Sequence, residues 1–172
     1  MPLHRLEKML ARHGLQIARS SMCRWVQEVA ALSQPLLDRM KDEVLRSHAI
    51  QGDETPVKQQ EQGRGKTKTC YFYCYLGDES HPYILFDYRG HRARAGPNAW
   101  FCDERGNPRY HGLLQCDAYT GYHELFGKPW QISQVGCWAH ARRKFYDVRD
   151  QFPGPCHHVL GQIRQLYAIE RE

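Results

Sequence analysis

Apolar residues recur at helical spacing over residues 3–45. The first series ends before Gly14, a common helix stop, so we predict a helix of about ten residues there. The second series begins after Ser20 and Ser21, either of which is a suitable helix cap. It contains Pro35, which we expect to kink or split the helix. The N-terminal segment is therefore predicted to be a pair of helices.

Two helices joined by a short turn permit two interpretations. In a helix-turn-helix motif the second helix enters the major groove of DNA, and Ser21, Arg24 and Gln27 would lie near its base-facing end. The alternative is an ordinary helical hairpin that packs through its apolar stripe. The sequence leaves both interpretations open.

From residue 48 the pattern changes to that of β-strands. Residues 69–76 (TCYFYCYL) and 82–88 (PYILFDY) are aromatic and β-branched, and the polar turn GDES separates them. Such a pattern predicts a β-hairpin. We predict a further strand over residues 48–57, before the hairpin.

Strand and helix patterns alternate in the rest of the chain, where Pro153 and Pro155 are expected to break the chain before a last helix from residue 156. The other elements predicted here are strands over residues 112–116 and 131–135 and helices over residues 98–102, 118–126 and 137–148. Three strands followed by alternating helices and strands indicate an α/β fold with a mixed sheet and flanking helices. We therefore divide the chain into a helical segment, residues 1–47, and an α/β core, residues 48–172.

Composition narrows the class of protein. Hydrophobic residues make up 41% and charged residues 25%, which suits a globular domain and excludes a fibrous or wholly disordered chain. The net charge of +5 favours an anionic partner such as nucleic acid. The apolar runs are too short for a membrane span, no signal-peptide core is present, and the seven cysteines do not form a compact disulfide frame. We expect a cytoplasmic location.

Two aspartates interrupt or end apolar strands, Asp53 in IQGDETP and Asp117 in LLQCDAYTGY. If these strands are neighbours, both carboxylates project at one edge of the sheet and can share divalent cations. Two such cations stabilise the attacking and leaving oxygens of an in-line phosphoryl displacement, and Mg²⁺ prefers oxygen ligands. Each aspartate also has an ordinary alternative, a strand-ending turn at Asp53 and a helix cap at Asp117.

Three strings, GDETPV, QCDAYTGY and CWAHARRKF, occur in this order, with the strand YFYCYL between the first two. They resemble the core of insertion sequence 66 family transposases. The N-terminal HRLEKMLARHGLQIARSSMCRWV and the terminal LYAIERE resemble that family too, so the resemblance covers almost the whole chain.

The resemblance implies a DDE transposase with a ribonuclease-H-like fold, in which two aspartates and a glutamate bind two Mg²⁺ ions, with Mn²⁺ as a substitute. Asp53 would be the first acid and Asp117 the second. Glu54 is left out, because strand alternation turns it to the opposite face. The implied reaction is DNA transposition and recombination at insertion-sequence ends, in a bacterial cytoplasm and at the nucleoid.

The third acid of the family lies beyond the LYAIERE-like helix, so the role is not transferred to Glu170 or Glu172. We expect a central transposase fragment that is inactive alone. Its partners would be DNA, a full-length transposase or an accessory insertion-sequence protein, and further copies of itself. One rival hypothesis is a non-catalytic DNA-binding fragment that modulates a full-length transposase. Another is a free-standing nuclease, which Glu170 beside the two aspartates would favour.

Basic side chains are candidates for contacts with DNA phosphates, and a solvated basic face is the alternative. The candidates are Arg24, Arg89, Arg92, Arg94, His140, Arg142, Arg143 and Lys144. Cys137 and His140 also have the spacing of a zinc-ligand pair, to which Cys70 and Cys74 could add two ligands. Strand geometry argues against that zinc site, because Cys70 and Cys74 would lie roughly 13 Å apart in an extended strand.

Overall fold

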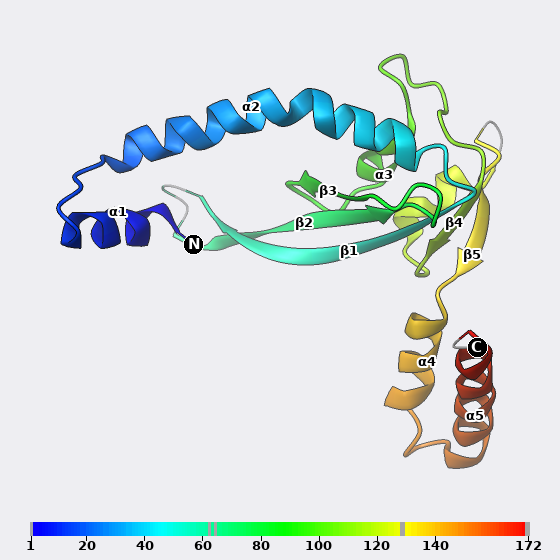
Figure 1. Cartoon of the computed structure of the whole chain (residues 1–172). Coiled ribbons are helices and arrows are strands. Elements are labelled where there is room, and N and C mark those ends of the chain that lie inside the picture. Colours follow the sequence, from blue (N-terminus) through cyan, green and yellow to red (C-terminus); the bar gives the residue numbers. More distant parts are fainter. Residues whose placement is uncertain (1, 62, 64, 128–129, 171–172) are drawn as a thin grey trace. The chain divides into compact units, whose positions relative to one another are not determined.

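A computed structural model describes residues 2–61, 63, 65–127 and 130–170 (Figure 1). The chain divides into two compact units, Met1–Asp42 and Glu43–Glu172. None of the helices in this described part combines the length and the hydrophobicity that a membrane span requires.

The N-terminal unit contains α1, Leu3–Arg12, and most of α2, Arg19–Val44. The length of α1 confirms the prediction. The predicted cap of the second helix is wrong, because α2 begins at Arg19 and both Ser20 and Ser21 lie in its first turn. Of the two effects expected of Pro35, a kink or a split, the split does not occur, since α2 continues through this residue as a single helix of 26 residues.

The C-terminal unit is built on a five-stranded sheet with the order β3-β2-β1-β4-β5. β1, β2 and β3 are antiparallel, whereas β1, β4 and β5 run parallel. The predicted α/β fold with a mixed sheet and flanking helices is thereby confirmed. The strands are β1, Ala49–Gln60; β2, Thr67–Leu76; β3, Ile84–Arg89; β4, Leu113–Cys116; and β5, Ser133–Gly136.

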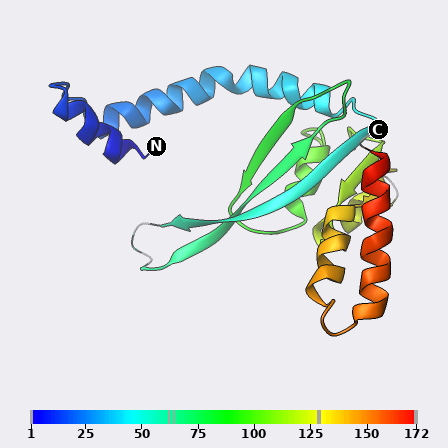
Figure 2. The same cartoon turned by 60° about the horizontal axis from the view of Figure 1, so that its bottom comes forward.

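Four helical elements accompany the sheet. They are α3, Ala95–Phe101; the 3-10 helix η1, Thr120–Leu125; α4, Trp138–Asp147; and α5, Pro153–Ile169. The order of elements agrees with the sequence prediction, but the two prolines do not precede the last helix. They occupy its first turn, where a proline is tolerated because the N–H it lacks would have no helical partner. α4 and α5 form an antiparallel helical hairpin (Figures 1 and 2).

The core lies on one face of the sheet, where α3 and η1 pack. Tyr75 of β2 stacks on Trp100 of α3 with ring centroids 3.9 Å apart, and Trp100 meets Phe101 edge to face. Tyr122 of η1 is fully buried and lies next to Gly52 of β1. The opposite face of the antiparallel half is open in the described structure, with exposed side chains at Phe72, Ile84, Phe86 and Tyr88.

Candidate active site

Asp53 lies in the central strand β1, on the face that the core does not use. Ile50 and Gly52 are buried, and the intervening positions of the strand are exposed, as period-two alternation requires. The side chain of Asp53 is 59% exposed. Its neighbour across the ladder in β2 is Cys74. A rigid strand thus presents this carboxylate to solvent.

Asp117 directly follows β4, the parallel neighbour of β1. Gln51 pairs with Gln115, and the same register continued by two residues brings Asp53 level with Asp117. The strand adjacency on which the sequence argument depends is therefore present. Asp117 Oδ1 also accepts a hydrogen bond of 2.8 Å from the N–H of Tyr119, so the carboxylate shapes the turn into η1.

The first turn of α4 brings His140 close to Asp53. His140 Nε2 lies 3.9 Å from Asp53 Oδ1, which makes an ion pair when the imidazole is protonated. His140, Cys137 and Arg143 line two adjoining depressions, one containing Asp53 and the other containing Asp117. The same helical turn therefore borders both acids.

Glu54 faces the core, as strand alternation predicts, and its side chain is only 4% exposed. Arg92 donates two hydrogen bonds to Glu54 Oε1, from Nε at 3.1 Å and from Nη2. Glu54 Oε2 is buried and has no hydrogen-bond partner among the described residues. Burial raises the pKa of Glu54, and the hydrogen bond from Arg92 offsets part of that rise.

The zinc alternative has no support in the described part of the chain. No group of three or more His, Cys, Asp and Glu side chains gathers there in a way that could hold a metal ion. Cys70 is buried and donates from Sγ to Gln59 Oε1 at 3.0 Å. Glu170 borders an apolar cavity with Trp138 and Ile163. It does not join Asp53 and Asp117 in the described structure, so the arrangement that would favour a free-standing nuclease is not present there.

Asp53 and Asp117 fit a hard divalent cation. Both present carboxylate oxygens, and two carboxylates leave most of an octahedral shell to water and substrate phosphates, the usual mode of Mg²⁺ binding in phosphoryl-transfer sites. The exposure of Asp53 leaves access for such ligands. Zinc, by contrast, usually takes nitrogen and sulfur ligands. The donor set therefore suits Mg²⁺ or Mn²⁺.

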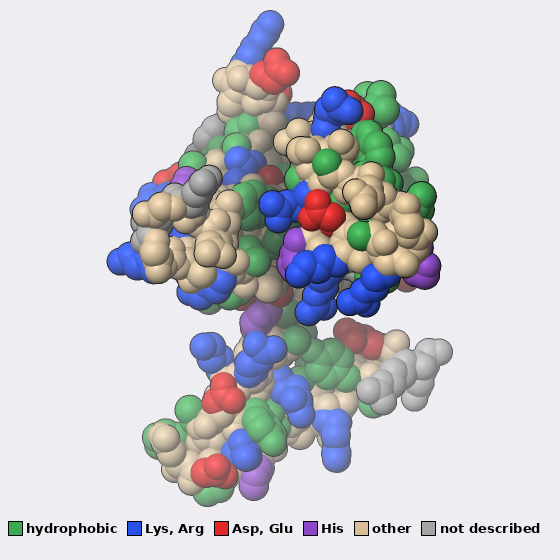
Figure 3. Space-filling view, turned by 90° about the vertical axis from the view of Figure 1, so that its left-hand side faces the viewer, with side chains coloured by type: hydrophobic (Ala, Val, Ile, Leu, Met, Phe, Trp, Pro, Cys, Tyr) green, Lys and Arg blue, Asp and Glu red, His purple; other side chains and the backbone are tan. Residues whose placement is uncertain are grey.

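Apart from His140, which lies beside Asp53, the basic candidates divide into two groups. Four arginines form ion pairs, and these pairs are Arg24–Glu28, Arg89–Asp87, Arg92–Glu54 and Arg94–Glu124. Within the described ranges, the α4 residues Arg142, Arg143 and Lys144 have no acidic partner. All three lie in α4, and basic side chains are spread along the helical hairpin in the lower part of Figure 3. The unpaired group is thus the one on the helix that borders both acids.

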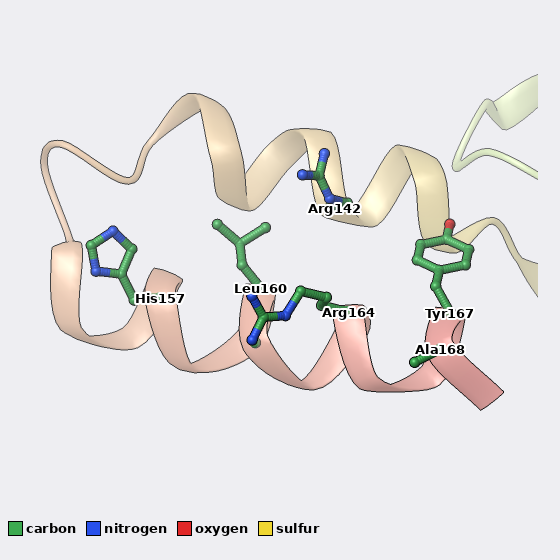
Figure 4. A pocket seen from close by; sticks show the side chains of 7 residues that line it. Arg142, His157, Leu160, Arg164, Tyr167 and Ala168 are labelled. Atoms are coloured by element: carbon green, nitrogen blue, oxygen red, sulfur yellow. The ribbon is translucent and has the colours of Figure 1, made fainter.

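The three unpaired side chains of α4 line two separate depressions. Arg143 and Lys144 line the depression that contains Asp117. Arg142 lines a separate cavity between α4 and α5, together with His157 and Arg164 of α5 (Figure 4). Of the three cations, two are therefore close enough to the acids to act on the same substrate.

The strand order defines an α/β protein with a mixed five-stranded sheet, in which two acids stand on or directly after its neighbouring central strands. The chain belongs to the IS66 transposase family, since the family model described as "Transposase IS66 family" matches residues 1–172.

Two relatives come from Sinorhizobium fredii (strain NBRC 101917 / NGR234). "Uncharacterized protein y4qI" is 30% identical over 160 residues, covering 86% of this chain and 29% of the relative. "Uncharacterized protein y4jD" is 28% identical over 187 residues, covering 100% of this chain and 35% of the relative. The chain thus spans about a third of the length of these curated relatives.

Two solved structures are similar at low sequence identity. One is the HTLV-2 integrase catalytic core domain in complex with magnesium (trimeric form), with a TM-score of 0.39, 12% identity, and coverage of 68% of this chain and 82% of that one. The other is the simian T-cell lymphotropic virus intasome in complex with PP2A regulatory subunit B56 gamma, with a TM-score of 0.35, 11% identity, and coverage of 68% and 47%.

Proposed function

We propose that this chain carries the first two acids of a DDE transposase, Asp53 and Asp117, and serves two-metal phosphoryl transfer at the DNA ends of an insertion sequence. The observation that supports this most directly is the parallel pairing of β1 with β4, whose register, if continued by two residues, would bring the two acids level. Membership of the transposase family supports DNA as the substrate. The work of the chain would then take place in the cytoplasm, at the nucleoid.

The residues around the acids have distinct roles in this proposal. Bound Mg²⁺ or Mn²⁺ would stabilise the attacking and leaving oxygens of the scissile phosphate. Asp53 and Asp117 would hold the cations, and His140 would donate an N–H to a phosphate oxygen beside Asp53. Arg143 and Lys144 would neutralise DNA phosphates without reading the base sequence.

A DDE site needs a third carboxylate, and no third acid joins Asp53 and Asp117 among the described residues. We therefore propose that the 172-residue chain binds the cations weakly and does not transfer strands by itself. Another segment or another polypeptide, such as a full-length transposase or a further copy, would supply what the site lacks.

Titration calorimetry of the chain with Mn²⁺ tests the acid pair. Asp53→Asn and Asp117→Asn keep the shape of the side chain and remove its charge. Each is expected to weaken binding by about a hundredfold or more, at least as much as the largest losses caused by removing an outer-shell group. The matched control is Asp150→Asn, because Asp150 is an exposed acid after α4 whose ion pair in the described structure is with Arg149. A folded wild-type chain that binds no Mn²⁺ would contradict the proposal.

The second candidate function is a non-catalytic DNA-binding fragment, and the unpaired cations of α4 favour it. In that case Arg143→Gln weakens DNA binding for all sequences alike and lowers the salt dependence by about one counterion. DNA affinity would remain intact in Asp53→Asn, and Mn²⁺ would not bind. Measuring DNA binding and Mn²⁺ binding for the wild type, Asp53→Asn and Arg143→Gln separates the two functions.

A further inference from the structure

Arg92 connects the two segments that carry the acids. It lies in the loop between β3 and α3, and its guanidinium donates twice to Glu54 Oε1, next to Asp53 in β1. The guanidinium carbon also lies 3.8 Å from the ring centroid of Tyr119, a cation–π contact. A single side chain thus bridges β1 and the turn that follows Asp117.

The bridge includes the buried carboxylate of Glu54, and burying a charged group costs free energy. The Glu54 side chain is 4% exposed, whereas that of Arg92 is 41% exposed. Removing a carboxylate from water costs several kcal/mol, and a paired arginine repays this cost only in part, so such a pair contributes little to stability. A buried pair of this kind is better explained by the geometry that it imposes on its surroundings.

Tyr119 transmits that geometry to Asp117. Its backbone N–H donates to Asp117 Oδ1 at 2.8 Å, so a shift of Tyr119 shifts the carboxylate. A Cβ atom placed on Gly121 would lie 2.2 Å from Cε1 of Tyr119, which means that the ring packs against a position without a side chain. The ring therefore packs against both Gly121 and Arg92.

We propose that Arg92 is a positioning residue for the acid pair: by bridging Glu54 and Tyr119 it holds Asp117 level with Asp53. This inference rests on the proposed function of the two acids as cation ligands. It gives Arg92 a different role from the phosphate contact expected from its place in a basic loop.

A positioning role and a purely electrostatic role of Arg92 predict opposite changes in Mn²⁺ affinity when Arg92 is removed. Removing a positive charge near two carboxylates strengthens their attraction for a cation. Loss of positioning weakens binding, because a cation that needs near-ideal octahedral geometry tolerates little displacement of its ligands. The sign of the change in Mn²⁺ affinity therefore separates a positioning role from an electrostatic one.

The first measurement is Mn²⁺ affinity in the full chain for Arg92→Gln, Arg92→Lys and Arg94→Gln. Arg92→Gln is expected to lose about tenfold, as for other groups that orient metal ligands. Arg92→Lys is expected to recover part of that loss, since it keeps the charge but not the two-donor fork. Arg94→Gln removes the same charge from the same loop, where Arg94 pairs with exposed Glu124, and should leave the affinity unchanged. Unchanged or tighter binding by folded Arg92→Gln would overturn the inference.

A second variant covers the case in which Arg92→Gln does not fold. Gly121→Ala displaces the Tyr119 ring without removing any charge or hydrogen-bonding group, so it should weaken Mn²⁺ binding in the same way. Normal affinity in Gly121→Ala would count against the inference. Affinity for DNA in the absence of metal should be unchanged in Arg92→Gln, and a loss equal to that of Arg143→Gln would assign Arg92 to a phosphate contact instead.

Hydrogen exchange of the Tyr119 amide, measured without metal, keeps the inference separate from the proposed function. Arg92→Gln should speed this exchange by about tenfold, because the Tyr119–Asp117 hydrogen bond opens more often, and Arg94→Gln should not. Faster exchange in a chain that binds no Mn²⁺ would leave the positioning role intact and refute only the proposed function. Unchanged exchange would refute the positioning role, whatever the cation does.

Discussion

Two adjacent acids of β1 meet opposite surroundings. Asp53 is 59% exposed on the open face of the sheet, whereas Glu54 is 4% exposed on the face that α3 and η1 cover. Period-two alternation places neighbouring residues of a strand on opposite faces, so one strand supplies both a solvent-exposed acid and a buried acid that is paired within the fold. Packing on the covered face thus fixes the positions of the side chains, whereas the open face carries the acid that is proposed to bind a cation.

The same contrast extends across the sheet. Asp53 pairs with Cys74, which pairs with Phe86, and this row lies on the open face. The next row, Gly52 with Tyr75 and Tyr75 with Leu85, lies on the covered face. Changes on the covered face should therefore cost stability, whereas changes on the open face should cost little stability and should affect cation binding only at the acids.

The largest effect is expected for Trp100→Ala on the covered face. Trp100 is 5% exposed and contacts both Tyr75 and Phe101, so its removal leaves a large cavity among aromatic rings. We expect a loss of about 3–5 kcal/mol in the free energy of unfolding, measured with denaturant. Trp25→Ala in α2 is the matched control, since Trp25 is 47% exposed and its removal should cost far less. Equal losses in the two variants would break the contrast between the faces.

Arg92→Gln should have the next largest effect. It leaves the buried Glu54 carboxylate without its partner, which we expect to cost about 3 kcal/mol. The double variant Arg92→Gln/Glu54→Gln buries no charge, so it should recover most of that loss. Arg94→Gln, which breaks an exposed pair, should cost less than about 1 kcal/mol. Thermal and denaturant unfolding of the four proteins give the comparison, and a double variant no more stable than Arg92→Gln would refute the role of the charge.

Cation binding at the open face should stabilise the folded chain, by less than Arg92→Gln is expected to destabilise it. A ligand at ten times its dissociation constant adds about 1.4 kcal/mol to the free energy of unfolding. Mn²⁺ at that level should therefore raise Tm of the wild-type chain, and a chelator should reverse the rise. Asp53→Asn should show neither change, while its stability without metal stays close to that of the wild type because its side chain is exposed. A rise in Tm that persists in Asp53→Asn would place the cation elsewhere.

The sequence predicts the elements of the fold well because their signals are local. Alternating aromatic residues define the β2–β3 hairpin, and an apolar run ending in an acid defines β4. The errors are local too. A proline in the first turn of α5 lacks a backbone N–H, but an N–H at that position would have no carbonyl partner within the helix. Pro35 is accommodated within α2. Element identity follows from pattern, whereas element ends depend on backbone details that pattern does not contain.

The candidate site is predictable only in part. Asp53 and Asp117 are recognisable because each stands at a break in an apolar strand, but the pairing of β1 with β4 is a long-range contact that periodicity does not encode. Arg92 and Glu54 are 38 residues apart, and the sequence indicates only a basic loop and an acid turned away from the site. The signal that could have revealed the bridge is the Tyr119–Gly121 spacing after Asp117, because a glycine two residues from an aromatic ring permits close packing.

The smallest effect is expected for Phe86→Ser, on the open face. Phe86 is 68% exposed although it lies in the same row as Asp53, and an exposed side chain of this kind contributes little to the stability of the chain. We expect a change within about 0.5 kcal/mol in the free energy of unfolding and no change in Mn²⁺ affinity. Leu85→Ser, one residue earlier and buried, is the matched control and should be strongly destabilising, because it places an unpaired hydroxyl in the core. If Phe86→Ser also costs more than about 1.5 kcal/mol, and the loss depends on protein concentration, then a second copy covers this face in solution. The acids would in that case lie beside an interface, and the contrast between an open and a covered face would hold only for the isolated chain.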